Sequence, residues 1–255
     1  LSRLGIRRME VRGVDGRNVS VLTPAEVKTA AARLRDAGVT VSAVGSPLGK
    51  IAADGDIPAH METARRVFET AGLLGTRLVR VFSFYPGALT GEAFREAALT
   101  QLDRLLTLAD EAGVTLCHEN EADILGESPE ACRALLDAFG GRLRCVFDMG
   151  NFVLGGYDPL GAYRLLRPYI DYFHIKDARR DGCIVPPGCG DARIAEILTD
   201  YAAASAPVPV TLEPHLHAFV GLSDLTGRSL ATPFTYPDGE SAMRDARDRL
   251  IAMLA

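Results

Sequence analysis

The sequence lacks several features that would place it in other classes of protein. No apolar run approaches the ~18 residues needed to span a bilayer, and no signal-peptide pattern opens the chain. The net charge is -5, so the chain lacks the basic excess that binders of duplex nucleic acid need. Its five cysteines show no paired spacing, so we predict reduced thiols in a cytoplasmic protein rather than a disulfide framework.

The composition is that of an ordinary globular protein, with 47% hydrophobic and 24% charged residues among 255. Short apolar runs alternate with longer segments of helical periodicity along the whole chain. Such alternation is typical of right-handed β–α–β units and a parallel sheet. No low-complexity linker divides the chain, so residues 1–255 are predicted to form a single α/β domain of the (β/α)8 TIM-barrel class.

Seven strands are predicted, at residues 6–12, 39–45, 78–83, 114–119, 144–148, 169–175 and 208–213. Helices are predicted between them, among them 59–75, 92–113 and 239–255. Thr23-Pro24-Ala25-Glu26 is a capping box, and Ser128-Pro129 and Asp158-Pro159 open two later helices. A closed barrel has eight strands, so we expect the first β/α unit to be missing from the printed chain. An open seven-stranded sheet is the alternative.

Four consecutive predicted strands end in an ionisable residue: Glu119, Asp148, His174 and Glu213. Parallel strands all point the same way, so these side chains should converge at the carboxyl ends, where barrel active sites lie. Three carboxylates in a partly dry pocket repel one another, and a divalent cation with an imidazole ligand removes that conflict. The donor set favours Mn²⁺, Mg²⁺ or Co²⁺, with Zn²⁺ as a further option.

Taken singly, each of these residues has a plainer explanation. An acidic residue at a strand end is often a helix cap or a salt-bridge partner, and His174 alone fits a hydrogen-bonded core histidine. The metal hypothesis therefore depends on four such residues recurring at the same place in successive units.

Around these positions the sequence resembles the xylose isomerase-like TIM barrels, often called the sugar phosphate isomerase/epimerase family. The resemblance covers nearly the whole chain and includes the strings HEN at 118–120, FDMGNF at 147–152, HIKD at 174–177, PGCGD at 187–191 and LEPH at 212–215. It implies a four-ligand metal site of Glu119, Asp148, His174 and Glu213, with Glu119 and Glu213 also acting as a proton-transfer pair. These motifs indicate the fold and the metal site together, but no particular substrate.

The activity that the resemblance implies is isomerisation or epimerisation of a small sugar, keto-polyol or sugar phosphate. A metal-stabilised enediolate would form when one glutamate removes a proton beside a carbonyl. Return of a proton on the opposite face gives epimerisation, and return at the neighbouring carbon gives isomerisation. General acid–base help of this kind contributes ~10²–10⁴-fold.

Four further residues are predicted to contact the substrate. Lys50 follows a strand end in a glycine-rich turn, with a solvated surface position as the alternative. Lys176 and His215 each lie two residues past a ligand, and Asn151 either reaches the sugar or caps the next turn.

Two residues are predicted to contact the metal ligands without binding the metal themselves. Strand alternation turns His118 away from the face of Glu119, and Arg80, in mid-strand, is expected to pair with a carboxylate.

Several loop residues give weaker signals. Asp191 is predicted to cap a helix, Gly188-x-Gly190 is a weak phosphate signal, and Glu121 is either a further acid or solvated. Residues 218–237 form a long connection, predicted to be a lid or a dimer contact anchored by Phe219 and Phe234. A homodimer is therefore one predicted assembly.

Three rival functions fit parts of the pattern. A lyase acting on a keto-glycoside would use the same ligands. An abasic-site endonuclease needs a trinuclear zinc cluster and more histidines than the five present. A non-enzymatic binding module predicts a degraded ligand set, whereas all four positions are intact. We expect a small carbohydrate as substrate, and neither nucleic acid nor a membrane as partner.

Overall fold

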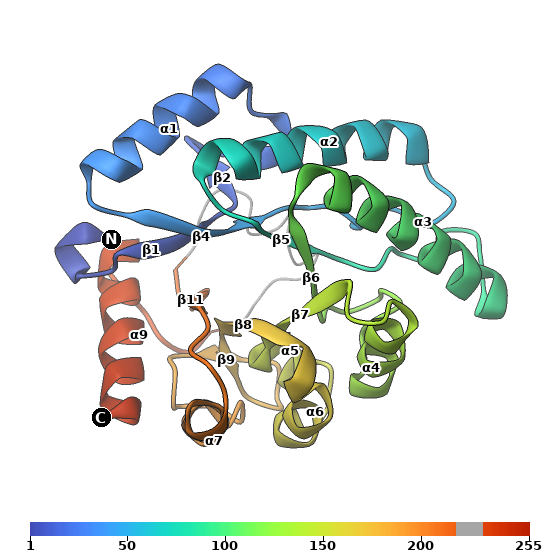
Figure 1. Ribbon diagram of the computed structural model, residues 1–255. Coiled ribbons are helices and arrows are strands. Elements are labelled where there is room, and N and C mark those ends of the chain that lie inside the picture. The colour runs from blue at the N-terminus through green and yellow to red at the C-terminus, as the bar shows by residue number, and fades with distance from the viewer. Residues whose placement is uncertain (218–231) are drawn as a thin grey trace. The chain divides into compact units, whose positions relative to one another are not determined.

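The computed structural model of the protein describes residues 1–217 and 232–255 (Figure 1). The chain separates into two compact units, each of which is described by itself. The first comprises Leu1–Glu127 and Ala134–Cys145, and the second comprises Ser128–Arg133 and Val146–Ala255. The predictions of a single domain and of a further β/α unit before residue 1 stay predictions.

Seven strands form one sheet in the order β1-β4-β5-β6-β7-β8-β11. The strand pairs β1–β4, β4–β5, β5–β6 and β8–β11 are parallel. The order within the sheet follows the order in the chain, as in a barrel built from successive β–α–β units. The seven predicted strands are confirmed, as β1 (Arg8–Val11), β4 (Thr40–Gly45), β5 (Leu78–Val81), β6 (Thr115–Glu119), β7 (Leu143–Asp148), β8 (Ile170–Ile175) and β11 (Val210–Leu212).

In the first unit, three helices lie side by side along one face of strands β1, β4, β5 and β6 (Figure 1). Helix α1 has the predicted capping box, in which Thr23 and Glu26 hydrogen-bond reciprocally. Helices α2 and α3 end at Gly75 and Gly113, whose left-handed φ angles of 75° and 67° suit glycine. The three helices are α1 (Pro24–Asp36), α2 (Ile57–Leu74) and α3 (Gly91–Ala112).

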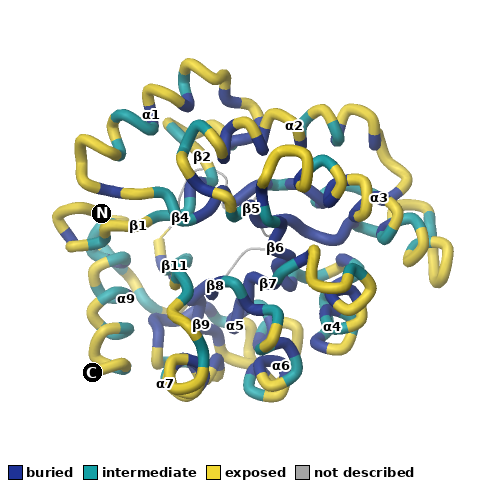
Figure 2. Tube along the Cα trace, in the orientation of Figure 1, coloured by how far each residue is buried: buried dark blue, intermediate teal, exposed yellow. Residues whose placement is uncertain are grey.

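Strands β5 and β6 and the second half of β4 are largely buried (Figure 2). Ala43, Val44, Val79 and Val81 are fully buried, as expected for a parallel sheet covered on both faces. Fully burying a valine side chain contributes about 1.5–3 kcal/mol. This burial fixes the strands whose ends lead into the candidate site.

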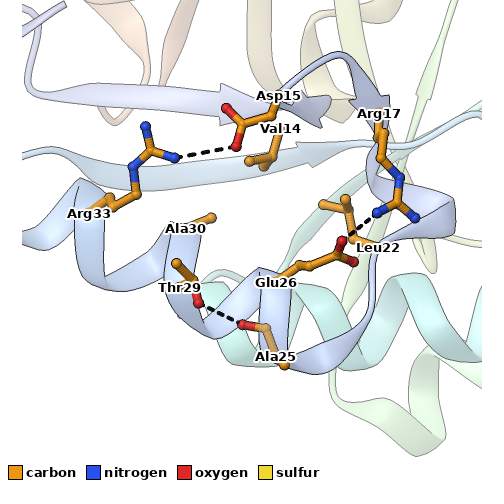
Figure 3. Close-up of a pocket in the computed structure, with 9 residues that line it drawn as sticks. All are labelled: Val14, Asp15, Arg17, Leu22, Ala25, Glu26, Thr29, Ala30 and Arg33. Carbon is orange, nitrogen blue, oxygen red and sulfur yellow. Dashed lines mark hydrogen bonds and ion pairs between the residues drawn. The ribbon is translucent and has the colours of Figure 1, made fainter.

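A short antiparallel hairpin, which the sequence did not predict, precedes α1. Its strands are β2 (Gly13–Val14) and β3 (Arg17–Asn18), and its turn, Asp15-Gly16, has two positive φ angles. Two-residue strands are too short to show an alternating pattern. A groove of about 270 Å³ lies between this hairpin and α1 (Figure 3). The Asp15–Arg33 and Arg17–Glu26 ion pairs line it, and it contains none of the predicted site residues.

The second unit contains helices α5 (Met149–Leu154), α6 (Pro159–Leu166), α7 (Ile194–Ala204) and α9 (Gly239–Leu254). The carboxylate of Asp158 caps α6 by accepting from the N–H groups of Leu160 and Gly161, as predicted. Helix α5 was not predicted. It begins directly after β7, and a second short hairpin, β9 (Asp177–Ala178) with β10 (Ile184–Val185), follows β8.

The remaining elements are short or belong to both units. Helix α4 (Pro129–Ala138) begins at Ser128-Pro129, as predicted, and the Ser128 hydroxyl accepts from the N–H of Ala131. Single 3₁₀ turns occupy Ser2–Leu4, Val19–Val21 and Arg167–Tyr169. Of the helices in the part of the chain that the structure describes, none combines the length and the apolarity that a membrane crossing requires.

Candidate functional site

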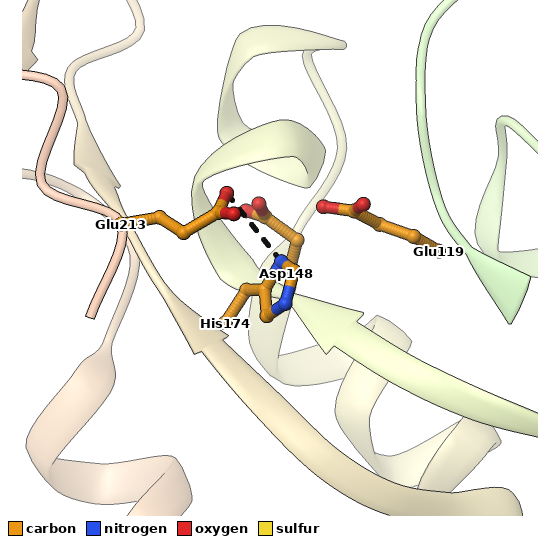
Figure 4. Close-up of side chains that lie close together, drawn as sticks. All are labelled: Glu119, Asp148, His174 and Glu213. Carbon is orange, nitrogen blue, oxygen red and sulfur yellow. Dashed lines mark ion pairs between the residues drawn. The ribbon is translucent and has the colours of Figure 1, made fainter. Parts of the chain in front are cut away.

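Three of the four predicted ligands lie in the second unit, each at the end of a strand. Asp148 is the last residue of β7, His174 is the penultimate residue of β8, and Glu213 directly follows β11. Each offers one ligand atom, and these atoms lie within 4.8 Å of one another. Figure 4 draws these side chains as sticks, together with Glu119.

The pairing of β8 with β11 explains how His174 and Glu213 meet. His174 lies opposite Thr211, and Glu213 is two residues further on, so it shares the face of Thr211. The Glu213 N–H continues the ladder to the carbonyl of Ile175 at 3.1 Å. The result is a distance of 3.5 Å between His174 Nδ1 and Glu213 Oε2.

Burial differs among these three side chains in a way that matters for chemistry. The side chains of Asp148 and His174 are fully buried, whereas that of Glu213 is 20% exposed. Glu213 is therefore the group of the three that a substrate or solvent can reach.

Glu119, in the first unit, is the last residue of β6 and is buried. The β5–β6 register places Arg80 opposite Cys117, so Glu119 shares the face of Cys117 two residues further on. Arg80 Nη1 lies 3.1 Å from Glu119 Oε2, and Arg80 Nη2 donates to the carbonyl of Ser46 at 3.3 Å. The pairing of Arg80 with a carboxylate is thus confirmed.

The chemistry of the donor set fits a divalent cation. The candidate group consists of Glu119, Asp148, His174 and Glu213, and carboxylates with an imidazole are common ligands of Mn²⁺, Mg²⁺, Co²⁺ and Zn²⁺. Two ligands about 2.0–2.2 Å from one ion lie at most roughly 4.4 Å apart. The atoms of Asp148, His174 and Glu213, within 4.8 Å of one another, need only small side-chain rotations to reach that geometry.

The two carboxylate oxygens of Asp148 have different neighbours. Oδ1 accepts from the backbone N–H of Asn151 at 2.8 Å, which makes Asp148 the N-cap of α5. Oδ2 lies 2.9 Å from Lys176 Nζ. Lys176 was predicted to contact the substrate. In the structure its ammonium group instead forms an ion pair with Asp148, a candidate metal ligand. Asn151 lies in the first turn of α5 and donates its N–H to this cap, so Asp148 and not Asn151 is the N-cap of α5.

His215 lies beside Glu213, with 4.0 Å between His215 Nε2 and Glu213 Oε2. Its φ of 46° is positive, which is uncommon for a residue other than glycine. This conformation turns the chain directly after the buried Pro214.

Lys50 is not a solvated surface lysine. Its side chain is only 12% exposed, and its Nζ lies 3.1 Å from Glu121 Oε2 and 4.3 Å from the ring centroid of Phe82. The turn before it depends on Gly49, which has a φ of 85° and leaves no room for a Cβ against the carbonyl of Phe82. His60 Nε2 accepts from the Gly49 N–H at 3.0 Å and so fixes this turn.

His118 contacts neighbouring loops rather than a substrate position. Its Nε2 lies 3.0 Å from the hydroxyl of Ser83, which also accepts from the N–H of Gly126 at 2.7 Å. Burial lowers the pKa of His118 to about 4, so the imidazole is neutral near pH 7. The hydrogen bonds thereby tie together the segments that follow β5 and β6. No role was predicted for Ser83 from the sequence.

Asp177, for which no role was predicted from the sequence, is a heavily hydrogen-bonded side chain close to His174 in the chain. Its two oxygens accept four backbone N–H groups at 2.8 to 3.1 Å, from Ala178, Gly188, Gly190 and Ala192. Burial raises the pKa of Asp177 above its usual value, and the four N–H donors act in the opposite direction. Asp177 thus holds the loop at 187–191 in place.

Two loop predictions are corrected by these contacts. Asp191 does not cap a helix: its carboxylate accepts from the N–H of Arg180 at 2.9 Å, and α7 starts after Arg193 without a side-chain cap. The N–H groups of Gly188 and Gly190, which suggested a phosphate site, donate to Asp177 instead. Phe219 lies outside the described residues, and Phe234 is half-buried.

Comparisons with known proteins agree with this architecture. The sequence profile of the xylose isomerase-like TIM barrels matches residues 1–228. A 2-epi-5-epi-valiolone 7-phosphate 2-epimerase from Actinoplanes sp. is 30% identical over 200 residues, which cover 77% of this chain and 72% of that protein.

Solved structures show the same fold. An L-ribulose 3-epimerase superposes with a TM-score of 0.73 at 19% identity, covering 99% of this chain and 85% of that one. A xylose isomerase-like TIM barrel protein from Mycobacterium smegmatis, in complex with magnesium, superposes with a TM-score of 0.72 at 17% identity, covering 99% and 86%. On the match of the family profile, this chain belongs to the xylose isomerase-like TIM barrel family.

Proposed function

We propose that the protein is a divalent-metal-dependent isomerase or epimerase of a small sugar, keto-polyol or sugar phosphate. The observation on which this depends is the convergence of Asp148, His174 and Glu213, whose ligand atoms lie within 4.8 Å of one another at strand ends. The family supports it, and so does the Actinoplanes relative, which is named as an epimerase.

In this proposal Glu119 joins Asp148, His174 and Glu213 to hold one cation, with Mn²⁺, Mg²⁺ or Co²⁺ favoured over Zn²⁺. When bound, the cation would polarise the substrate carbonyl and stabilise the negative charge that develops on its oxygen. One observation favours this use of Glu119: it is the last residue of β6, as Asp148 is the last residue of β7.

The proton transfers are assigned to the two glutamates. One carboxylate takes the proton from the carbon beside the carbonyl, and the other, protonated, returns a proton to the opposite face. Glu213 is suited to contact with a substrate because its side chain is 20% exposed. Return of the proton to the adjacent carbon, with the hydroxyl and carbonyl exchanged, gives isomerisation with the same groups.

Other residues are proposed to position the substrate. The Lys50–Glu121 pair offers a donor and an acceptor to sugar hydroxyls, and the Phe82 ring gives Lys50 a fixed apolar support. His215, whose Nε2 lies 4.0 Å from Glu213 Oε2, is proposed to donate to a substrate oxygen near that carboxylate. Asn151 is proposed to contact the sugar through its side chain.

The test is hydrogen exchange into substrate. The Mn²⁺-loaded protein is incubated with ketoses, inososes, their phosphates and keto-glycosides in D₂O, and the products are examined by NMR. We expect deuterium at one carbon beside a carbonyl. Release of a leaving group with an unsaturated product would instead support the lyase, and no exchange into any substrate would contradict the proposal.

Glu213→Gln separates the acid–base role from metal binding, because the amide oxygen can still act as a ligand. We expect exchange to fall by roughly 10²–10⁴-fold, while Mn²⁺ binding, followed by calorimetry, is retained. Glu62→Gln, on the exposed face of α2, is the matched control and should exchange like the wild type. Wild-type exchange in Glu213→Gln would remove Glu213 from the mechanism.

The proposal also includes the cellular compartment and the oligomeric state of the protein. The five cysteines form no disulfide with one another, which favours a reducing, cytoplasmic compartment. A homodimer stays a prediction, which sedimentation velocity would test.

A further inference from the structure

Lys176 and Asp148 form a buried ion pair within the second unit. Lys176 Nζ lies 2.9 Å from Asp148 Oδ2, and the two side chains are 6% and 0% exposed. Bringing two charges out of water costs several kcal/mol each, and the pair offsets this cost only while both partners are present. The contact therefore compensates the charge of one proposed metal ligand.

The surrounding chain is built to hold this lysine in place. A Cβ on Gly150 would lie 2.7 Å from the carbonyl oxygen of Lys176 and 2.8 Å from its Cγ, so glycine there lets the lysine cross the first turn of α5. The next residue, Asp177, is held in place because its carboxylate accepts four backbone N–H groups. The ammonium reaches Asp148 from a constrained backbone.

We propose that Lys176 is a built-in counter-cation of the metal centre, which pairs with Asp148 until a divalent ion displaces it. The inference rests on the proposed function, because it takes Asp148 as a metal ligand. A divalent ion at Asp148 and an ammonium at the same carboxylate repel each other strongly at such distances. Metal binding therefore moves the ammonium off Asp148.

The displaced ammonium has a flexible four-carbon stem and remains beside the site. It then serves as a positioning group for a substrate oxygen that bears negative charge. Lys176 contacts the substrate only after the metal has bound, so the metal binds before the substrate. This order reconciles the predicted substrate contact with the observed ion pair.

Metal affinity, measured by calorimetry with Mn²⁺, tests the displacement without any activity assay. Lys176→Met removes the competing charge and keeps the apolar stem, so we expect Mn²⁺ to bind about tenfold or more tightly than to the wild type. Lys28→Met, on the exposed face of α1, is the matched control and should leave the affinity unchanged. Unchanged or weaker binding in Lys176→Met would overturn the inference, whereas a wild type that binds no Mn²⁺ would overturn the proposed function itself.

A second measurement uses the wild-type protein, in case Lys176→Met does not fold. The lysines of the sequence are Lys28, Lys50 and Lys176, so labelling with [ε-¹³C]lysine gives a spectrum of three signals. These signals are assigned with Lys28→Arg and Lys50→Arg, and the protein is titrated with diamagnetic Mg²⁺ or Zn²⁺. We expect the Lys176 signal to move as the metal binds while that of Lys28 stays in place. A Lys176 signal that does not respond at metal saturation would overturn the displacement.

Discussion

Asp177 and Gly190, 13 residues apart in the chain, are joined by a hydrogen bond of 3.0 Å from the Gly190 N–H to Asp177 Oδ2. A Cβ at position 190 would collide with the same carboxylate. The hydrogen bond therefore needs a glycine at position 190. With the N–H groups of Ala178, Gly188 and Ala192, this contact fills the anion-binding concavity of the loop with a carboxylate of the chain itself.

Asp177→Asn is expected to lower the free energy of unfolding by about 2–4 kcal/mol, because the amide –NH₂ would face N–H groups that need an acceptor. Urea denaturation measures the loss. Asp36→Asn makes the same chemical change at an exposed position and should alter stability by less than about 0.5 kcal/mol. Equal stability of the two variants would show that the four N–H contacts do not hold the loop.

Arg80→Met is expected to destabilise the protein by about 3–5 kcal/mol, since it leaves Glu119 as an uncompensated charge in a buried position. Adding Glu119→Gln should recover part of this loss, because the neutral amide needs no counter-charge. The double-mutant cycle in urea tests the coupling, and strictly additive effects of the two substitutions would count against the ion pair.

The protein should lose stability in mild acid partly through His60. Burial lowers the pKa of His60 below its ordinary 6.5, and its Nε2 must stay unprotonated to accept from Gly49. The unfolded chain therefore takes up this proton at a higher pH than the folded chain does, so folding stability declines as the pH falls through 6.5 toward the lowered pKa of the folded state. His60→Gln retains an acceptor oxygen and should show a shallower decline between pH 7.5 and 5. Parallel pH profiles for the wild type and His60→Gln would exclude this contribution.

Divalent cations should stabilise the folded protein. At a free concentration of 100 times Kd, one bound ion adds about 2.7 kcal/mol to the free energy of unfolding. We expect Mn²⁺ to raise the Tm, a chelator to reverse the rise, and Asp148→Asn to abolish it, whereas Asp36→Asn should behave like the wild type. If Mn²⁺ still raised the Tm of Asp148→Asn, the stabilising ion would bind at a site other than Asp148.

The strands and candidate ligands could be predicted because they depend on regular patterns. A parallel strand places its last residue at the same end as its neighbours do, so Asp148 and His174 could be brought together without knowing any contact. Loop contacts follow no such repeat. Three of the four N–H groups that Asp177 binds lie 11 to 15 residues away, and Asp191 was wrongly assigned to a helix cap because its carboxylate turns back to the N–H of Arg180. The position of Lys176 depends on the missing side chain of Gly150, which no periodicity reveals.

Because Asp148 both caps α5 and belongs to the candidate ligand group, the backbone amide of Asn151 is a natural spectroscopic reporter of metal occupancy. A cation that withdraws electron density from the carboxylate weakens Oδ1 as an acceptor, and the Asn151 amide proton should respond with an upfield shift. Occupancy of the centre could then be followed residue by residue in the substrate-free protein, long before its sugar is identified.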